Sequence, residues 1–321
     1  MNATPHATPS LRGNKTGVLH ELARNKGLYL LAIPGILFFL VFCYLPLIGI
    51  IIPFKNYNVI DGIFGSPFVG LKNFQFLLKS RDLPQITFNT VFLNALFIIF
   101  GTLSQVAVAM MINEIGSRTF KKLSQGFLLL PYFISWVIVG VITFYIFGTE
   151  SGFLNVIRRA FGATPVEWYN SPQYWPAILT LIYIWKWVGY GSIIYLSAIV
   201  GIDQEIYESA QIDGCDRWRL IRHITLPLLV PTMMIMLLLA VGRIFYGDFG
   251  MILNVVRNNV MLYQTTNIID TYVYRALMGT GTGGSIAMAS AAGLLQSVLG
   301  FLTILAANMV VNRVNSDYAL F

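Results

Sequence analysis

Long apolar segments alternate with shorter polar ones along the whole chain. The apolar segments lie at about 28–52, 87–112, 124–148, 175–201, 229–254 and 286–311. Each is long enough for the roughly 18–20 apolar residues that a helix needs to cross a bilayer. A membrane β-barrel would show short alternating segments instead of continuous runs. The pattern predicts an all-α polytopic membrane protein with six transmembrane helices, surrounded by the lipid bilayer.

An even number of spans places both termini on the same side of the membrane. Basic residues lie directly before the first span and in the loops 113–123 and 202–228. Because loops rich in Lys and Arg stay in the cytoplasm, we expect both termini and these two loops to be cytoplasmic. The opposite loops also carry basic residues, so charge separates the two sides by a small margin. The expected divisions are a tail at 1–27, a transmembrane domain at 28–311 and a tail at 312–321.

Composition supports a membrane protein and argues against other classes. Hydrophobic residues make up 56% of the 321 residues and charged residues 11%, against roughly 25% charged in soluble domains. The net charge of +7 is spread over the loops without a dense basic patch, so we expect no nucleic-acid partner. Cys43 lies in an apolar span and Cys215 in a polar loop, which excludes a disulfide between them.

Two local features are expected to shape the spans. Pro34 and Pro46 in the first span and Pro131 in the third each lack a backbone N–H and predict kinks. The last span begins with small residues between Ile286 and Gly293, which permit close helix packing. We therefore expect the sixth helix to be central or to lie at a subunit contact.

The polar loop before the fifth span predicts two short capped helices joined by a glycine turn. Asp203 is placed to cap the first helix, and Gly214 to end it in the left-handed conformation. Asp216 is placed to cap the second helix, and Pro227 and Pro231 are expected to break that helix and begin the next span. Such a loop is either a well-capped connector or a surface that meets another protein, and local chemistry leaves both open.

A longer motif in this loop resembles a known family. Glu-x-Ala, three residues, Gly, nine residues and Ile-x-Leu-Pro resemble the signature loop of permease subunits of binding-protein-dependent ABC importers. The matching residues are Glu208, Ala210, Asp213, Gly214, Ile224, Leu226 and Pro227, with Ser209 in place of the usual Ala. Segments 69–74 and 269–274 are similar to the carbohydrate-uptake branch of that family, which includes maltose-type and polysaccharide permeases.

The resemblance implies a six-helix type I importer permease in the bacterial cytoplasmic membrane that works by alternating access. It implies that loop 202–228 is a coupling helix that docks in a groove of a cytoplasmic ATPase. Glu208 would pair with a basic residue there, and the small Ser209, Ala210 and Gly214 would let the helix enter. Ile224, Leu226 and Pro227 would fix the loop to the membrane domain. The implied partners are a second similar permease, two ABC ATPases and an extracytoplasmic solute-binding protein.

No catalytic chemistry is expected in this chain. A phosphate-binding loop needs a glycine before Lys-Ser/Thr, and neither Lys15-Thr16 nor Lys79-Ser80 has one. His6, His20 and His223 are too scattered for a metal site or a proton relay. We therefore expect no cofactor here and expect ATP and Mg to be bound by the partner ATPase. An ion-coupled secondary transporter is the first rival hypothesis, but inverted repeats and a buried ion site are not evident. An intramembrane enzyme is the second.

Charged residues within spans mark a pathway or a structural pair. Lys186 lies between two tryptophans in the fourth span, and the simplest interpretation is a lysine that snorkels to the interface. Arg243 and Asp248 lie in the fifth span, five residues apart and therefore on different faces of a regular helix unless the nearby glycines distort it.

In maltose-type relatives the sugar site lies mid-membrane, and the matching region here is rich in aromatic and polar residues. The candidate pathway residues are Tyr132, Ser135, Trp136, Tyr183, Lys186, Trp187, Tyr190, Arg243, Tyr246 and Asp248. Aromatic faces suit sugar rings, and hydroxyl or guanidinium groups suit their oxygens. Ordinary packing is the alternative for each of them. We expect an oligosaccharide as cargo, with a non-sugar solute as the alternative, and Arg243 raises the hypothesis of a uronate-containing sugar.

Overall fold

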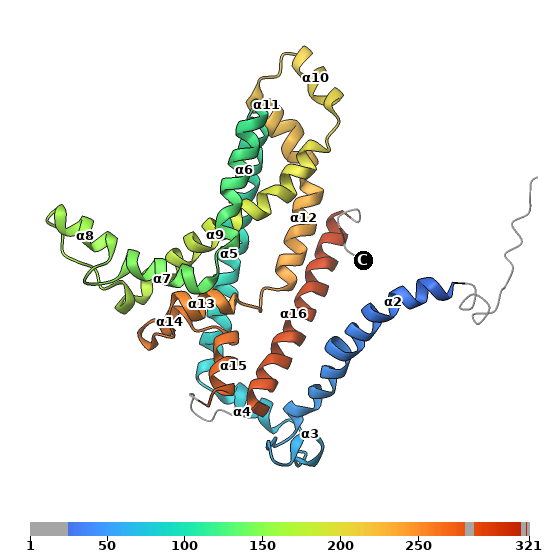
Figure 1. Ribbon diagram of the computed structural model, residues 1–321, viewed down its shortest axis with the longest axis vertical. Helices are drawn as coiled ribbons and strands as arrows, with labels where there is room; N and C mark the ends of the chain where they lie inside the picture. The colour runs from blue at the N-terminus through green and yellow to red at the C-terminus, as the bar shows by residue number, and fades with distance from the viewer. Residues whose placement is uncertain (1–24, 280–285, 316–318, 320–321) are drawn as a thin grey trace, which may run out of the picture. The chain divides into compact units, whose positions relative to one another are not determined.

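The computed structural model describes residues 25–279, 286–315 and 319. These residues are almost entirely helical, and within them the only β-pairing is an isolated bridge between Lys55 and Phe68 (Figure 1). The chain divides into two compact units, Met1–Ile51 and Ile52–Phe321. The predicted tails lie mostly outside the described residues, as do His6 and His20.

The described part of the first unit, from residue 25 on, is a single apolar helical stretch that continues past Ile51. It consists of α2 (Lys26–Phe39), a π turn (Leu40–Tyr44) and a 3-10 segment that runs on to Phe54. Pro46 has no N–H, and just before it the N–H of Leu45 bonds to the carbonyl of Leu40, one residue further back than in an α-helix. The predicted irregularity at Pro46 is therefore present as a widened turn. The side chains of α2 are not buried within the chain, as expected of a helix that faces lipid or a partner.

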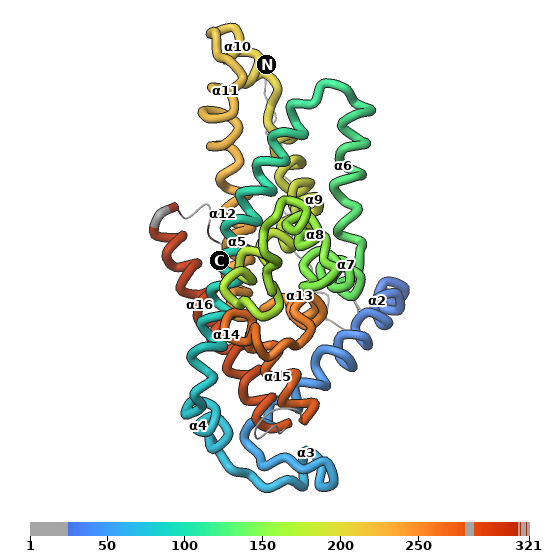
Figure 2. The backbone as a smooth tube through the Cα atoms, turned by 90° about the vertical axis from the view of Figure 1, so that its left-hand side faces the viewer, coloured from blue at the N-terminus to red at the C-terminus, as the bar shows by residue number. Residues whose placement is uncertain are grey.

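The second unit contains the remaining helices. In chain order they are α3 (Gly62–Gly65), α4 (Lys72–Lys79), α5 (Asp82–Asn113), α6 (Arg118–Phe133), α7 (Trp136–Phe147), α8 (Phe153–Ala160), α9 (Trp175–Val200), α10 (Gln204–Ile212), α11 (Arg217–Leu220), α12 (Leu226–Gly242), α13 (Phe249–Val255), α14 (Tyr263–Thr266), α15 (Ile269–Leu277) and α16 (Ile286–Val314). Within this unit, α10 and α11 lie at one end and α4 and α15 at the other (Figure 1, Figure 2).

The described residues include five helices long and apolar enough to cross a membrane. They are Lys26–Phe54, Asp82–Asn113, Pro172–Val200, Arg217–Gly242 and Ile286–Arg313. A sixth span results if α6 and α7, which are bent by 93° at a short break, count as one. Helices overlap each predicted span, with differences in the third and fifth, and the total of six stays a prediction.

The third predicted span is not one kinked helix, and that part of the prediction is wrong. Pro131 lies in the last turn of α6, and the chain leaves the helix at Ile134, whose backbone is extended. Ser135 then caps α7 through its side-chain oxygen, which accepts a hydrogen bond from the N–H of Ile138 at 3.4 Å. Because the Ser135 side chain pairs a free N–H at the start of α7, a new helix can begin there. The span therefore breaks sharply, whereas proline alone would only kink it.

The fifth predicted span ends earlier and begins differently than expected. α12 stops at Gly242, so Arg243 and Asp248 lie in a non-helical segment instead of on two faces of one helix. At its start, the proline break is also wrong, because Arg217–Gly242 is a continuous helical stretch. A π turn at Ile221–Thr225, closed by the N–H of Leu226 on the carbonyl of Ile221, accommodates the following proline.

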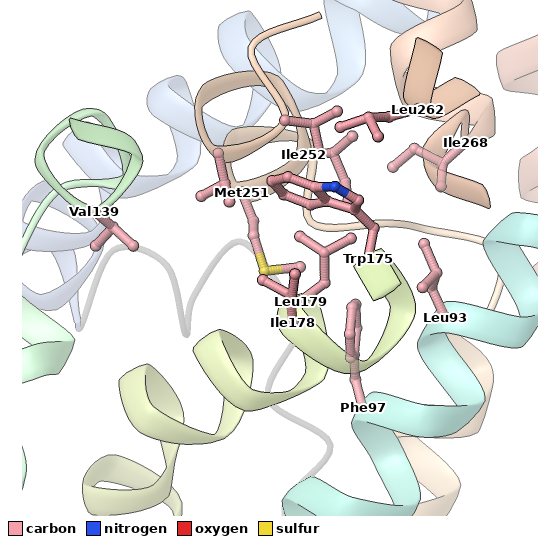
Figure 3. Close-up of a cluster of buried hydrophobic side chains, with 12 residues drawn as sticks. Leu93, Phe97, Val139, Trp175, Ile178, Leu179, Met251, Ile252, Leu262 and Ile268 are labelled. Atoms are coloured by element: carbon pink, nitrogen blue, oxygen red, sulfur yellow. The ribbon is translucent and has the colours of Figure 1, made fainter. Parts of the chain in front are cut away.

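Two buried clusters hold the second unit together. The Trp175 cluster joins α5, α7, α9 and α13, and Figure 3 shows the Trp175 ring between side chains of α5, α9 and α13. The indole Nε1 of Trp175 donates to the carbonyl of Trp168 at 2.8 Å, so this fully buried ring leaves no polar atom unpaired. The Tyr195 cluster joins α5, α9 and α12; its members are Val106, Ala109, Ile112, Tyr195, Leu196, Ile199 and Leu229.

Small residues set the closest helix contacts. The alanines at the start of α16 are buried where α16 packs on α15, as the small-residue run predicted. At Gly140, α7 approaches α13 so closely that a Cβ would overlap the carbonyl oxygen of Asn254. Only glycine allows these two backbones to meet.

We predict that Gly140→Ala lowers the stability of the protein by about 1–3 kcal/mol, since α7 and α13 must move apart to admit the methyl group. The thermal unfolding midpoint of the purified protein in detergent measures this. Gly126→Ala in α6 is the matched control, because nothing lies within 4 Å of its Cβ position. Equal midpoints for the two variants would contradict the close contact.

Candidate functional site: a central cavity and a partner-facing loop

A cavity of about 510 Å³ opens near the middle of α5 and α9 and beside the last turn of α12. On α9 its lining residues lie between those of the Trp175 cluster and those of the Tyr195 cluster, and on α5 Phe97 belongs to both the Trp175 cluster and the cavity lining. The lining residues are Asn94, Phe97, Ile98, Trp136, Tyr183, Trp187, Ala240, Arg243, Tyr246, Gly247, Asp248 and Phe249. A volume of this size is typical of small-molecule sites, which range over about 300–1,000 Å³.

The structure brings many of the predicted pathway residues together at this cavity. Those that line it are Trp136, Tyr183, Trp187, Arg243, Tyr246 and Asp248. The others lie outside the lining: the rings of Tyr132 and Tyr190 stack on each other at 4.6 Å, and Ser135 caps α7. Tyr132 also meets the Trp187 ring edge-on, so this pair supports a cavity wall from behind.

Lys186 does not snorkel to the interface, and that interpretation is wrong. Only 5% of its surface is exposed, and its Nζ donates to the carbonyls of Pro131 at 3.2 Å and Tyr132 at 3.1 Å, and also to that of Ile134. The last carbonyls of a helix have no partner within the helix and carry its negative end charge. Lys186 thus binds the carbonyl end of α6 at the break, with its Nζ 4.9 Å from the centre of the Trp136 ring.

The cavity offers donors and aromatic faces. The guanidinium of Arg243 has no hydrogen bond or ion pair with any residue in the described part of the chain. The Nε1–H of Trp187 is buried and has no hydrogen bond of ordinary geometry within that part, although the Asp248 carboxylate is close enough to interact with it. Tyr246 shares a hydrogen bond with Ser297 at 2.8 Å. The open guanidinium of Arg243 beside aromatic rings suits a polar ligand with flat apolar faces.

Sequence reasoning missed the side chains that hold the segment between α12 and α13 in place. Asn94 donates to the carbonyls of Ile244 at 2.8 Å and Tyr246 at 3.2 Å. Gln296 donates to the carbonyl of Phe245 at 2.6 Å, and the Asp270 carboxylate accepts the N–H of Gly247 at 2.8 Å. These groups come from α5, α16 and α15. Burial raises the pKa of the Asp270 carboxyl, and its hydrogen-bond donors act against that rise. Polar residues in apolar spans were the available signal.

The two caps and the glycine turn of the loop after α9 are as its sequence predicted, although the second helix continues into α12. The Asp203 side chain accepts the N–H of Glu205 at 3.1 Å and caps α10, and Asp216 caps α11 through the N–H of Arg219 at 2.8 Å. Gly214 has a φ of 82°, and the N–H groups of Gly214 and Cys215 bond back into the last turn of α10. This is a Schellman ending, which places the left-handed residue just past the helix.

The same loop is fixed to the membrane helices by contacts that the motif does not contain. The hydroxyl of Tyr207 bonds to the buried hydroxyl of Thr225 at 3.0 Å, which joins α10 to the start of α12. Arg217 lies 3.9 Å from Glu114 at the end of α5, an exposed pair of small energetic weight. Leu226 packs on the Tyr195 cluster. The loop is thereby attached to α5, α9 and α12 together.

The predicted coupling residues divide into an exposed and a supporting group. Glu208, Ser209, Asp213 and Gly214 are exposed on α10 and its turn, and Pro227 is exposed as well. Ala210, Ile224 and Leu226 are partly buried. Two apolar side chains near this turn are strongly exposed, Ile212 at 87% and Trp218 at 70%. Exposed apolar groups beside a carboxylate are typical of a surface that meets a protein.

Comparison with known proteins identifies the family. Residues 105–316 match the family described as "Binding-protein-dependent transport system inner membrane component". The chain belongs to this family. It is a multi-pass inner-membrane permease of an ABC importer, and the predicted family and all-helical permease fold are confirmed. The number of spans and the side of the termini stay predictions.

Relatives match almost the whole permease. It is 33% identical over 296 residues to Protein LplB of Bacillus subtilis (strain 168), which covers 92% of each chain. It is 31% identical over 303 residues to the polygalacturonan/rhamnogalacturonan transport system permease protein YteP of the same organism, covering 94% and 92% of the two chains.

Solved structures give the same fold. A chain in the crystal structure of a bacterial ABC transporter involved in the import of the acidic polysaccharide alginate is 33% identical, with a TM-score of 0.83 and coverage of 92% of this chain and 99% of that chain. A second structure of the alginate transporter, in complex with alginate pentasaccharide-bound periplasmic protein, gives a TM-score of 0.82 with 92% and 98% coverage.

We predict that Lys186→Met destabilises the permease by several kcal/mol, because the carbonyls of Tyr132 and Ile134 lose their donor and each such buried carbonyl costs about 1–3 kcal/mol. The measurements are the thermal unfolding midpoint and the yield of assembled transporter. Lys122→Met, a change at an exposed position of α6, is the control and should match the parent protein. An unchanged midpoint for Lys186→Met would show that the carbonyl end of α6 does not need the ammonium.

Proposed function

We propose that this permease carries an acidic oligosaccharide through the central cavity, driven by an ATPase that binds the loop around α10. The observation that carries the proposal is the Arg243 guanidinium, which lines an aromatic cavity and has no anionic partner among the described residues. A guanidinium binds a carboxylate through two parallel hydrogen bonds. The rings of Trp136, Tyr183 and Trp187 supply faces on which a sugar ring can rest.

Two relatives support an acidic cargo by what their names state. YteP is named for polygalacturonan and rhamnogalacturonan transport, and the alginate transporter for an acidic polysaccharide. Each is about as similar to this permease as LplB, whose name states no cargo. A neutral oligosaccharide could accept hydrogen bonds from Arg243, but only an anionic cargo would also neutralise its charge.

The proposed assembly contains several further subunits. We place beside it a second similar permease, two ABC ATPases that bind ATP and Mg on the cytoplasmic side, and an extracytoplasmic solute-binding protein. The match to an importer in complex with its periplasmic protein supports the last of these. The permease itself has a transporting and not a catalytic role, and both termini lie on the cytoplasmic side with α10.

A mechanical path joins the proposed ATPase contact to the cavity. Arg217–Gly242 is one helical stretch of 26 residues, and such a stretch is roughly 39 Å long. Its first end is tied to α10 by the Tyr207–Thr225 hydrogen bond, and Ala240 near its other end lines the cavity. A displacement of α10 by ATP-driven closure of the ATPases would therefore move the cavity wall, which is what alternating access requires.

We predict that Glu208→Gln lowers ATP-driven uptake about ten- to a hundredfold, since a charge-assisted contact to the ATPase is worth about 1.5–3 kcal/mol. Uptake into proteoliposomes and the affinity of the permease for its ATPase are the measurements. Glu205→Gln, one turn earlier on the same exposed helix, is the matched control and should retain uptake. If both variants behave alike, Glu208 is not the coupling residue.

We predict that Arg243→Gln lowers the uptake of an acidic oligosaccharide about tenfold or more and leaves a neutral one of equal length unchanged. The reason is the loss of one guanidinium–carboxylate pair, about 1.5–3 kcal/mol. Initial uptake rates with saturating loaded binding protein provide the test, with Arg158→Gln in an outer loop as control. An equal loss for both cargoes, or none for either, would overturn the acidic assignment.

A further inference from the structure

A second cavity lies further along α7 and α13, whose first residues line the central cavity. It measures about 380 Å³ and is lined by Val137, Gly140, Val141, Phe144, Tyr145, Asn254 and Arg257. Trp136 at the start of α7 and Phe249 at the start of α13 line the central cavity. Phe144 is eight residues further along α7, a distance of roughly 12 Å at the usual rise of a helix. The two cavities therefore lie one after the other along α7 and α13.

Arg257 stands at this second cavity in an unusual backbone conformation. Its φ is 59° and that of Asn258 is 51°, so two successive residues that are not glycine adopt the left-handed region. The turn is held from both sides, because the Tyr263 hydroxyl donates to the Asn258 side chain at 2.6 Å and the Asn259 side chain donates to the carbonyl of Tyr169 at 2.6 Å. Strained turns of this kind persist where the surroundings fix them.

The turn holds the Arg257 guanidinium at the cavity, and no negatively charged side chain of the described residues pairs with it. Its central carbon lies 4.3 Å from the centre of the Phe144 ring, a cation–π contact that leaves the N–H edge of the guanidinium open. None of the residues that the structure describes forms a hydrogen bond or ion pair with it. Tyr169 lies nearby, but burial raises its pKa to about 12 against the opposing effect of Arg257. Its hydroxyl therefore stays neutral and donates to the carbonyl of Val255 at 3.2 Å.

The remaining lining suits a sugar. Asn254 donates through Nδ2 to the carbonyl of Gly250 at 2.8 Å, and its Oδ1 accepts no hydrogen bond from the described residues. It can therefore accept from a hydroxyl. Tyr145 is 65% exposed and offers an aromatic face beside the arginine. One guanidinium, one open amide oxygen and one exposed ring repeat the chemistry of the central cavity on a smaller scale.

We propose that Arg257, Asn254 and Tyr145 form a second subsite, which binds a carboxylate-bearing sugar unit of an acidic oligosaccharide while another unit occupies the central cavity. This proposal rests on the proposed function. By the predicted orientation, the turn at Arg257 belongs to an extracytoplasmic loop, so the subsite lies on the outer part of the route. It makes the permease selective for longer acidic chains, because only these reach both arginines.

The test uses the complete reconstituted transporter with its binding protein loaded with a uronic-acid disaccharide, with a uronic-acid hexasaccharide, or with a neutral hexasaccharide. At saturating loaded binding protein, Arg257→Gln should lower the rate of uptake of the acidic hexasaccharide about tenfold, which corresponds to about 1.4 kcal/mol. The acidic disaccharide and the neutral sugar should be transported at the parent rate. Arg257→Lys should recover part of the loss, since it keeps the charge without the planar fork.

Arg159→Gln is the matched control, because Arg159 is an exposed arginine of an outer loop whose side chain donates to the carbonyl of Glu150. An equal loss for both acidic lengths, or no loss, overturns the subsite. A higher half-saturating concentration of binding protein with every cargo would assign Arg257 to docking of that protein instead. Loss of assembly with the second permease would assign it to the subunit contact.

The two proposals fail separately. If Arg243→Gln discriminates acidic from neutral cargo and Arg257→Gln does not, only the second subsite is wrong. If neither variant discriminates, the acidic cargo itself is wrong, and the second subsite with it.

Discussion

The contact between the Lys186 ammonium and the carbonyl end of α6 is the constraint on which the central cavity depends. Within a bilayer no water satisfies free backbone carbonyls, so a span breaks only where protein groups replace the missing partners. Lys186 supplies those donors at Pro131, Tyr132 and Ile134. The chain can then turn by 93° and start α7 with Trp136 at the cavity.

The same constraint explains the segment between α12 and α13. Its irregular backbone would leave N–H and carbonyl groups unpaired, and Asn94, Asp270 and Gln296 bind them from three different helices. Each irregular segment leads directly to cavity-lining residues, so Trp136, Arg243 and Asp248 reach the cavity where helices stop, whereas Asn94, Tyr183 and Trp187 come from continuous helices. The Trp175 and Tyr195 clusters keep α5 and α9 together on either side of this weakly packed middle.

Local chemistry was enough to predict the caps and the turn of the α10 loop, because Asp203, Gly214 and Asp216 act on residues within a few positions of themselves. The break after α6, the role of Lys186 and the early end of α12 were not predictable in this way. Lys186 meets carbonyls that lie more than fifty residues earlier, and Asp270 meets a backbone group more than twenty residues earlier. A single sequence gives the polarity of such residues but not the partner that each one meets.

The π turn at Ile221–Thr225 affects how the rest of its helix is rotated about the helix axis. It adds a residue to one helical turn, so that Pro227 fits without interrupting the helix. Each residue of an α-helix turns the chain by about 100°. Whatever follows the π turn, including Ala240 in the cavity wall and the segment that carries Arg243, is therefore oriented by that one extra residue. The π turn, which lies beside the proposed ATPase-binding loop, therefore fixes the direction in which residues at the cavity end of the same helix point.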